Sequence, residues 1–162
     1  MTGADLRYLR YAIMIADRAS DHGSPPFGAV LVSSRGWILL EGENTQGTTC
    51  DCTCHAETNL LREATRRFSR KLLSHSALYT SAEPCPMCAG AIFWSGVGRV
   101  VFGLSSERVH SIAQDKAEHL SKRCADVLAV GSHHVEVLGP ILEEEAEAVF
   151  KKSIDRGRTL AH

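Results

Sequence analysis

Apolar and polar residues follow two different periods along this chain, and each period predicts a type of element. Between residues 4 and 20, apolar side chains recur at helical spacing, which predicts an amphipathic helix. Short runs rich in β-branched and aromatic residues, bounded by turn residues, predict strands. Two such runs, 27–32 and 37–42, enclose the turn-forming stretch 33–36 and predict a hairpin.

The rest of the chain continues as strands that alternate with helices. Further strands are predicted at 77–80, 98–103 and 135–138. Helices are predicted at 55–68, at 85–95, more weakly at 113–128, and at 141–154, whereas 44–53 is predicted to be a loop. This alternation favours a three-layer α/β/α fold with helices on both faces of one sheet. No linker or repeat divides the 162 residues, so we expect a single domain over 1–162.

Composition and charge exclude several classes of protein. Hydrophobic residues make up 44 % and charged residues 23 %, as in ordinary globular proteins. The formal net charge of −1 provides no global field that attracts nucleic acid. No apolar run approaches the length of a membrane span, and residues 1–7 lack the layout of a signal peptide. We therefore expect a cytoplasmic protein with no membrane partner.

Three potential metal ligands stand in two short motifs. His55 precedes a glutamate by two residues, and Cys85 and Cys88 belong to a Pro-Cys-Pro-Met-Cys stretch. A catalytic zinc has three protein ligands and leaves one position to water, whereas a structural zinc has four. The cysteines are spaced to share one face of a predicted helix start, where the helix dipole favours thiolates. We predict one catalytic Zn²⁺ per chain, held by His55, Cys85 and Cys88.

Glu57 completes this set without being needed as a ligand. A histidine two residues before a glutamate, followed by Pro-Cys-x-x-Cys, is typical of the zinc nucleobase deaminases, and hydrolytic deamination requires a hydroxide and a proton for the departing amine. Zinc lowers the pKa of its bound water to about 7, so the attacking hydroxide is available at neutral pH. Glu57 can carry the proton to the ring nitrogen and to the leaving ammonia, as general acid and base.

Each motif by itself permits a simpler interpretation. A Cys-x-x-Cys pair can be a redox pair or half of a zinc knuckle, and His-x-Glu also occurs by chance. A non-catalytic domain with a structural zinc would need a fourth ligand, Cys52 or Cys54, and would leave Glu57 without a role. Both motifs in this order favour the catalytic zinc.

Cys50, Cys52 and Cys54 alternate immediately before His55, and Cys124 stands alone. This pattern fits a reducing compartment better than a disulfide framework. Three interpretations of the alternating cysteines stay open: an exposed loop of small residues, a redox-sensitive thiol cluster, and an auxiliary metal ligand.

Over residues 5–103 the chain resembles the cytidine deaminase-like superfamily, nearest to the bacterial guanine deaminases and the tRNA adenosine deaminases. The resemblance rests on Pro26-Phe27-Gly28-Ala29-Val30, Asn44, His55-Ala56-Glu57 and the stretch 78–92. It implies a five-stranded mixed sheet in the order 2-1-3-4-5, with the last two strands parallel. It also implies a homodimer, and zinc ligands at His55, Cys85 and Cys88.

The resemblance further implies five substrate-contacting residues: Phe27, Asn44, Ala56, Trp94 and Asp115. Phe27 would stack on a base, which is worth about 1–3 kcal/mol, or it is a core strand residue. Asn44 would hydrogen-bond a ring atom, or it is a turn asparagine. Asp115 would contact the guanine edge, or it is a solvent-facing carboxylate, and Trp94 is otherwise a core residue.

The phenylalanine in Pro-Phe-Gly-Ala-Val resembles the guanine and cytosine branches, because the tRNA enzymes usually carry valine there. We therefore predict a zinc-dependent aminohydrolase for a small free amino-heterocycle, most simply guanine or a related purine base. Residues 155–162 lack the aromatic residue of the guanine deaminase tail, so cytosine, triazine and nucleoside substrates stay open.

A tRNA-editing adenosine deaminase is the other alternative. Its basic stretches at 62–71 and 151–158 would then contact phosphates. Solvated helix faces are the simpler interpretation of both stretches, so we do not expect nucleic acid as a partner.

Overall fold

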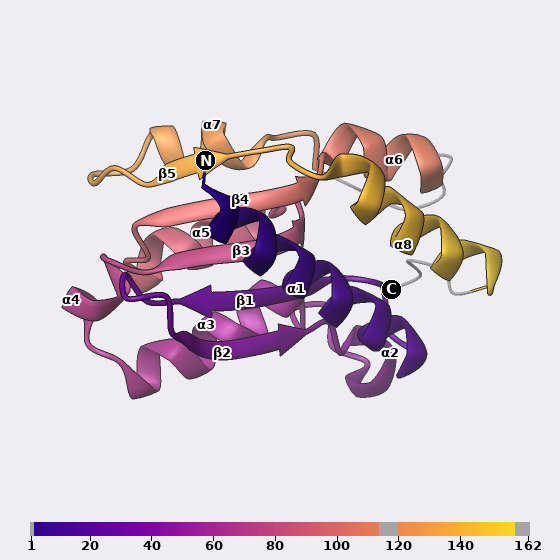
Figure 1. Cartoon of the computed structure of the whole chain (residues 1–162), viewed down its shortest axis with the longest axis horizontal. Coiled ribbons are helices and arrows are strands. Elements are labelled where there is room, and N and C mark those ends of the chain that lie inside the picture. The colour runs from indigo at the N-terminus through magenta and orange to yellow at the C-terminus, as the bar shows by residue number, and fades with distance from the viewer. Residues whose placement is uncertain (1, 114–119, 158–162) are drawn as a thin grey trace.

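The described part of the chain, residues 2–113 and 120–157, forms one five-stranded sheet with helices on both faces in the computed structural model (Figure 1). The strand order is β2-β1-β3-β4-β5. The strands are β1 (Gly28–Val32), β2 (Ile38–Glu43), β3 (Ala77–Ala82), β4 (Arg99–Leu104) and β5 (Glu136–Leu138). β1 pairs antiparallel with β2 and β3, whereas β4 lies parallel to both β3 and β5. The predicted fold class, strand order and parallel final strands are confirmed.

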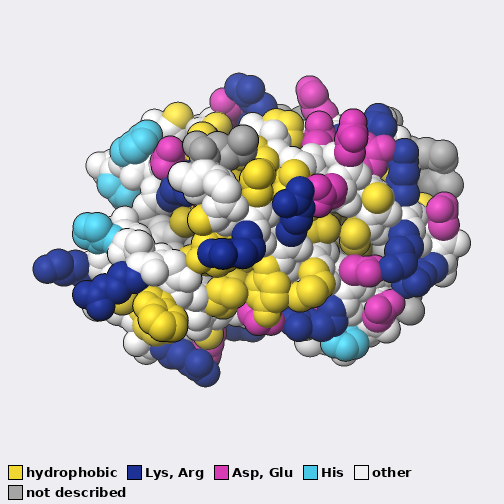
Figure 2. All heavy atoms as spheres, in the orientation of Figure 1, with side chains coloured by type: hydrophobic (Ala, Val, Ile, Leu, Met, Phe, Trp, Pro, Cys, Tyr) yellow, Lys and Arg dark blue, Asp and Glu magenta, His cyan; other side chains and the backbone are white. Residues whose placement is uncertain are grey.

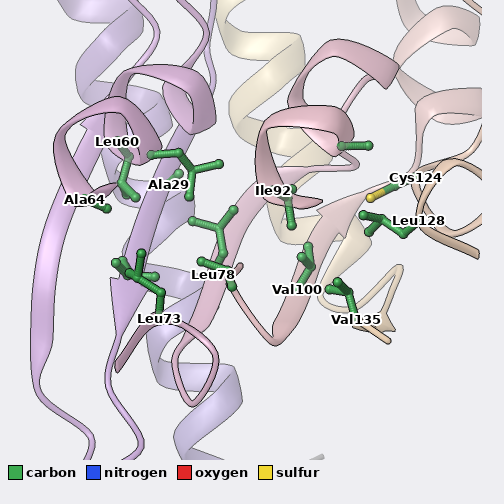
Figure 3. Close-up of a cluster of buried hydrophobic side chains, with 14 of the residues drawn as sticks. Ala29, Leu60, Ala64, Leu73, Leu78, Ile92, Val100, Cys124, Leu128 and Val135 are labelled. Atoms are coloured by element: carbon green, nitrogen blue, oxygen red, sulfur yellow. The ribbon is translucent and has the colours of Figure 1, made fainter. Parts of the chain in front are cut away.

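Neighbouring residues within a strand point to opposite faces of the sheet, and both faces are covered. Leu78 of β3 belongs to a buried cluster with α3 (Ala56–Arg67), α5 (Pro86–Ser95) and α7 (Cys124–Ala129) (Figure 3). The next residue, Tyr79, belongs to a second cluster, which contains residues of α1 (Gly3–Asp21), α6 (Ser106–Ala113) and α8 (Glu143–Asp155). The sheet therefore separates two apolar layers. Within the described residues, no helix combines the length and the hydropathy needed to span a bilayer.

Most predicted elements agree with the structure to within two residues at each end. Sequence periodicity missed the four-residue helices α2 (Gln46–Thr49) and α4 (Arg70–Leu73), which are too short to show a period. The helix predicted at 113–128 is wrong as one continuous element, although 124–128 is helical, and most of α6 (Ser106–Ala113) was not predicted. Helix α6 ends at Ala113, residues 120–123 are not helical, and α7 begins only at Cys124.

Helix α1 is tied to the sheet through Asp5. Its carboxylate accepts a hydrogen bond from the Thr2 backbone N–H at 2.6 Å, and the Thr2 hydroxyl accepts from the Asp5 N–H, which forms a capping box. The same carboxylate accepts from the Tyr79 hydroxyl and from Arg99 Nη1, each at 2.7 Å. The guanidinium is the largest of several causes that hold the pKa of Asp5 well below its usual range.

Helix α3 packs closely on β2 at Gly42. A Cβ atom at this position would lie 2.4 Å from the Ala56 carbonyl oxygen and 2.8 Å from Leu60 Cβ. Only a glycine allows the first turn of α3 to approach the strand so closely. This contact positions the helix start that carries His55 and Glu57.

Candidate metal centre and active site

Two helix starts bring the predicted ligands together. His55 is the N-cap residue of α3, Cys85 is the N-cap residue of α5, and Cys88 lies in the first turn of α5. His55 Nδ1 lies 3.6 Å from Cys85 Sγ and 3.5 Å from Cys88 Sγ. The three potential ligand atoms lie within 4.8 Å of one another.

This donor set fits a zinc ion. Zinc takes imidazole nitrogen and thiolate sulfur at about 2.0 and 2.3 Å in tetrahedral geometry, which separates the nitrogen from each sulfur by about 3.6 Å. The observed separations of 3.6 and 3.5 Å agree with that geometry. Three protein ligands also leave a fourth position, as in catalytic zinc sites.

The pKa values of the two thiols are shifted in opposite directions. A hydrogen bond with Cys88 lowers the pKa of Cys85 to about 4, and the His55 ring acts in the same direction. The same interaction, together with burial, raises the pKa of Cys88. Metal binding requires deprotonated thiols, so occupation of this site releases a proton.

Glu57 lies directly beside the ligands, with only 5 % of its surface exposed. Its Oε1 accepts a hydrogen bond from the Thr80 hydroxyl at 2.7 Å, and its Oε2 lies 3.4 Å from Cys88 Sγ. Burial raises the pKa of Glu57, while the Thr80 hydrogen bond opposes that shift. A carboxylate with a raised pKa in a closed site is suited to take up and deliver protons.

Phe27 and Asn44 lie at the same edge of the sheet as the metal ligands. The Asn44 N–H donates to the Phe27 carbonyl at 3.0 Å, and the Thr45 N–H donates to the Cys54 carbonyl, also at 3.0 Å. These backbone bonds place both residues beside the chain that leads directly into His55.

Residues 3–104 match the zinc-binding region of cytidine and deoxycytidylate deaminases. The chain belongs to this family. The protein is a zinc-dependent hydrolytic deaminase, and His55, Cys85 and Cys88 form the site that can hold its metal.

Relatives of this deaminase act on different substrates. A probable cytosine deaminase of Schizosaccharomyces pombe is 40 % identical over 158 residues, which cover 95 % of this chain and 94 % of that protein. A tRNA-specific adenosine deaminase of Haemophilus influenzae is 39 % identical over 132 residues, 77 % of this chain and 76 % of that protein. The solved guanine deaminase of Nitrosomonas europaea superposes with a TM-score of 0.74 at 27 % identity, covering 90 % and 82 % of the two chains.

Two of the predicted substrate residues of the deaminase, Asn44 and Phe27, lie close to the metal ligands, and both also make structural contacts. Asn44 is buried and forms a turn, because its Oδ1 accepts from the Gln46 N–H at 2.9 Å and its Nδ2 donates to Gln46 Oε1 at 2.8 Å. The second amide N–H of Asn44 has no partner among the described residues. Phe27 is partly buried, with its ring 5.7 Å from the ring of Phe150, and therefore packs in the core on at least one side.

The three other candidates lie in different surroundings. The Ala56 side chain is fully buried in the core, so only its backbone is available to a substrate. Trp94 is 77 % exposed, so the interpretation of Trp94 as a core residue is wrong. Asp115 lies outside the described residues.

Cys50, Cys52 and Cys54 are free thiols in the deaminase, the first two exposed and the third buried. Within the described residues the metal-ligand group contains only His55 and the two cysteines of α5. The structural-zinc alternative therefore has no fourth ligand from the alternating cysteines.

Sequence reasoning did not single out two residues that support the site. Thr80 lies within β3 and is fully buried, and a polar side chain inside a largely apolar strand was the available signal. Asn59 lies in α3 and donates to the carbonyls of Glu43 and Cys54 at 2.9 and 3.3 Å. Nothing in the sequence marks Asn59, because its partners lie at the end of β2 and in the segment before α3, and only the fold brings them to its side chain.

Proposed function

We propose that this deaminase acts on a small free amino-heterocyclic base, with guanine or a related purine as the first candidate. The supporting observation is that Phe27 and Asn44 share one edge of the sheet with the metal ligands. An aromatic face suits a planar ring, and an amide with a second N–H suits the polar edge of a base. In this proposal Ala56 contributes backbone contacts, and Trp94 and Asp115 remain candidate contacts.

Glu57 carries the protons in the proposed reaction. Zinc, when held by His55, Cys85 and Cys88, lowers the pKa of a water molecule to about 7 and so supplies the nucleophile. The Thr80 hydroxyl occupies Oε1 of Glu57, so Oε2 faces the ligands and takes up the proton. Glu57 delivers this proton to the ring nitrogen, then takes a second proton from the hydroxyl group that has been added to the ring carbon and passes it to the departing amine.

Cytosine is a second candidate substrate. The probable cytosine deaminase of Schizosaccharomyces pombe matches nearly the whole of both chains at 40 % identity. The same Phe27 and Asn44 can hold an amino-pyrimidine, because both rings are planar and both carry an amide-like edge.

The charge distribution argues against tRNA as the substrate. In the described part of 151–158, every lysine and arginine forms an ion pair with a carboxylate. In the stretch 62–71, Arg67 pairs with Glu63, whereas the other basic residues pair with no described carboxylate. Figure 2 shows basic side chains around the end of the molecule where α4 lies. In these two stretches, the basic residues without a described ion-pair partner are therefore confined to 62–71, which limits the number of phosphates that they could contact.

One experiment tests the proposal. Ammonia release by the purified, zinc-loaded protein is measured with guanine, adenine, cytosine, amino-triazines, their nucleosides and tRNA. We expect a free base to be turned over much faster than any nucleoside or tRNA. Turnover of tRNA, combined with submicromolar binding that weakens about 10³-fold between 50 and 200 mM salt, would establish the RNA-editing alternative instead.

We also propose that the protein is a homodimer. Met87, Gly90, Ala91 and Trp94 recur at helical spacing along α5, and Met87 and Trp94 are 36 % and 77 % exposed. An exposed apolar helix face of this kind is typical of a protein interface. A second copy of the chain is the partner that the family resemblance implies.

A further inference from the structure

Glu83 lies between β3 and the turn that carries Cys85, and its side chain joins two other helices to that turn. Its backbone N–H donates to the Leu104 carbonyl at 2.8 Å, which extends the pairing of β3 with β4. Its Oε1 accepts from the Cys124 N–H at 3.0 Å, and its Oε2 accepts from the Ser106 N–H at 3.1 Å. Ser106 and Cys124 are the first residues of α6 and α7.

A carboxylate is well suited to this position. The first N–H groups of a helix have no partner inside the helix and carry partial positive charge. Helix α7 has only six residues, and its N-cap residue Arg123 makes no side-chain cap hydrogen bond. So short a helix depends on contacts from outside itself. Both oxygens of Glu83 accept, so a glutamine, with one acceptor and one amino group, cannot replace it.

One of the two helices that Glu83 holds, α7, packs against the helix that contributes Cys88. Cys124 and Leu128 of α7 lie in the same buried cluster as Ala89 and Ile92 of α5, the helix that contributes Cys88 (Figure 3). Burial is the main cause of a raised pKa at Cys124, and the charges of Glu83, Glu57 and Cys85 add to it. The start of α7 is therefore within electrostatic reach of the catalytic groups.

We propose that Glu83 is a positioning residue of this deaminase. It holds the starts of α6 and α7 against the metal-ligand turn and thereby sets the shape of the substrate space, without contacting metal or substrate. The functional half of this inference rests on the proposed function. The structural half, that one carboxylate restrains both helix starts, is independent of the substrate.

Three variants separate this role from a general contribution to folding. Glu83→Gln removes the charge and one acceptor. Ser106→Pro removes the N–H that α6 donates to Glu83 and leaves the Cys124 N–H in place, at a first helical position where proline is tolerated. Glu143→Gln is the matched control, because Glu143 also accepts from the start of α6, at the Ser105 N–H (3.0 Å), but comes from α8.

Amide hydrogen exchange is measured first, since it requires no substrate. In Glu83→Gln we expect exchange at Ser106 and Cys124 to accelerate about tenfold or more. In Glu143→Gln we expect acceleration at Ser105 and not at Cys124. Unchanged exchange at Cys124 in Glu83→Gln would overturn the structural half.

Kinetics are then measured with the substrate that releases most ammonia, whichever base that is. We expect Glu83→Gln to raise KM about fivefold or more, with kcat within about threefold and zinc content unchanged. Ser106→Pro should shift KM in the same direction, and Glu143→Gln should leave KM within about twofold. Equal shifts of KM in Glu83→Gln and Glu143→Gln, or loss of zinc from Glu83→Gln, would overturn the positioning role. Absence of turnover with every base refutes the proposed function and the KM effect together, while the exchange result stands by itself.

Discussion

Glu57 has a buried carboxylate whose two oxygens face different neighbours. Thr80 donates to one oxygen, and the other faces the thiol of Cys88. A free-standing carboxylate would rotate between equivalent orientations, whereas this one has a single orientation because each oxygen has a specific partner. Proton transfer requires such an arrangement, since the distance to the reacting atoms must stay within hydrogen-bond reach.

Replacement of Glu57 should separate catalysis from metal binding. Glu57→Gln keeps the size of the side chain and an oxygen for Thr80 but cannot carry a proton, so we expect ammonia release to fall at least about 10²-fold. Zinc content, measured by metal analysis, should remain one ion per chain. Glu63→Gln is the control on the same helix, because Glu63 is 40 % exposed and its ion-pair partner among the described residues is Arg67. Loss of zinc, or activity above about a tenth of the wild type, would contradict the role of Glu57.

At the scale of elements, the start of α3 depends on how closely the helix packs against β2. Gly42→Ala would place a methyl group 2.4 Å from the Ala56 carbonyl, so helix and strand must separate. We expect a loss of about 1–3 kcal/mol in the free energy of unfolding, as for other overpacked sites. We also expect faster loss of zinc to a chelator, since His55 caps this helix. Gly3→Ala is the control, because a Cβ there meets no atom within 4 Å. Equal chelation rates in both variants would refute the coupling.

The hydrogen bonds of the Asp5 carboxylate, which join α1 to the sheet, should make the free energy of unfolding depend on pH. Arg99 depresses the pKa of Asp5 in the folded protein, so the ionised Asp5 carboxylate stabilises the folded state. This stabilisation is fully present above the unfolded pKa of about 3.9 and is lost as the pH falls below that value. Urea unfolding should show Asp5→Asn to be about 2 kcal/mol less stable than the wild type at pH 7.

The difference between the wild type and Asp5→Asn should narrow as the pH falls from about 5 towards 3. Asp21→Asn is the matched control on the same helix, because Asp21 is 60 % exposed in its pair with Arg156. We expect this substitution to lower the free energy of unfolding by at most about 0.5 kcal/mol. A stability difference for Asp5→Asn that stays constant with pH would contradict the electrostatic origin of this effect.

At the scale of the whole molecule, the apolar face of α5 should control assembly. Trp94→Glu places a charge in the proposed interface, where an unpaired buried charge is strongly unfavourable. We expect the wild type to be a dimer and this variant a monomer in light scattering coupled to gel filtration. Trp37→Glu is the matched control, because Trp37 is also exposed, at 71 %, but precedes β2 far from α5 along the chain. A monomeric wild type, or equal effects of both variants, would exclude α5 as the interface.

Local patterns in the sequence were sufficient for the sheet, most of the helices and the metal ligands. The short apolar runs of β1 and β3 predict strands, and in the structure successive residues of these strands enter the two apolar layers on opposite faces of the sheet. His55, Cys85 and Cys88 were predictable because their spacing and helix-start positions are properties of short segments, and the structure brings them together.

The tertiary structure decided the features that depend on contacts between distant segments. Helices α6 and α7 begin where Glu83 accepts their first N–H groups, and Glu83 is 23 and 41 residues away from these groups along the chain. Local periodicity contains no information about so distant a partner. The sequence therefore predicted one continuous helix at 113–128. Trp94 is exposed because its face of α5 lies away from the core, which its apolar sequence surroundings do not reveal. Thr80 gains its role because Ala29 and Phe102 of the neighbouring strands pair with it and align its hydroxyl with Glu57. Sequence patterns report the preferences of short segments, whereas these positions follow from which segments the folded chain brings into contact.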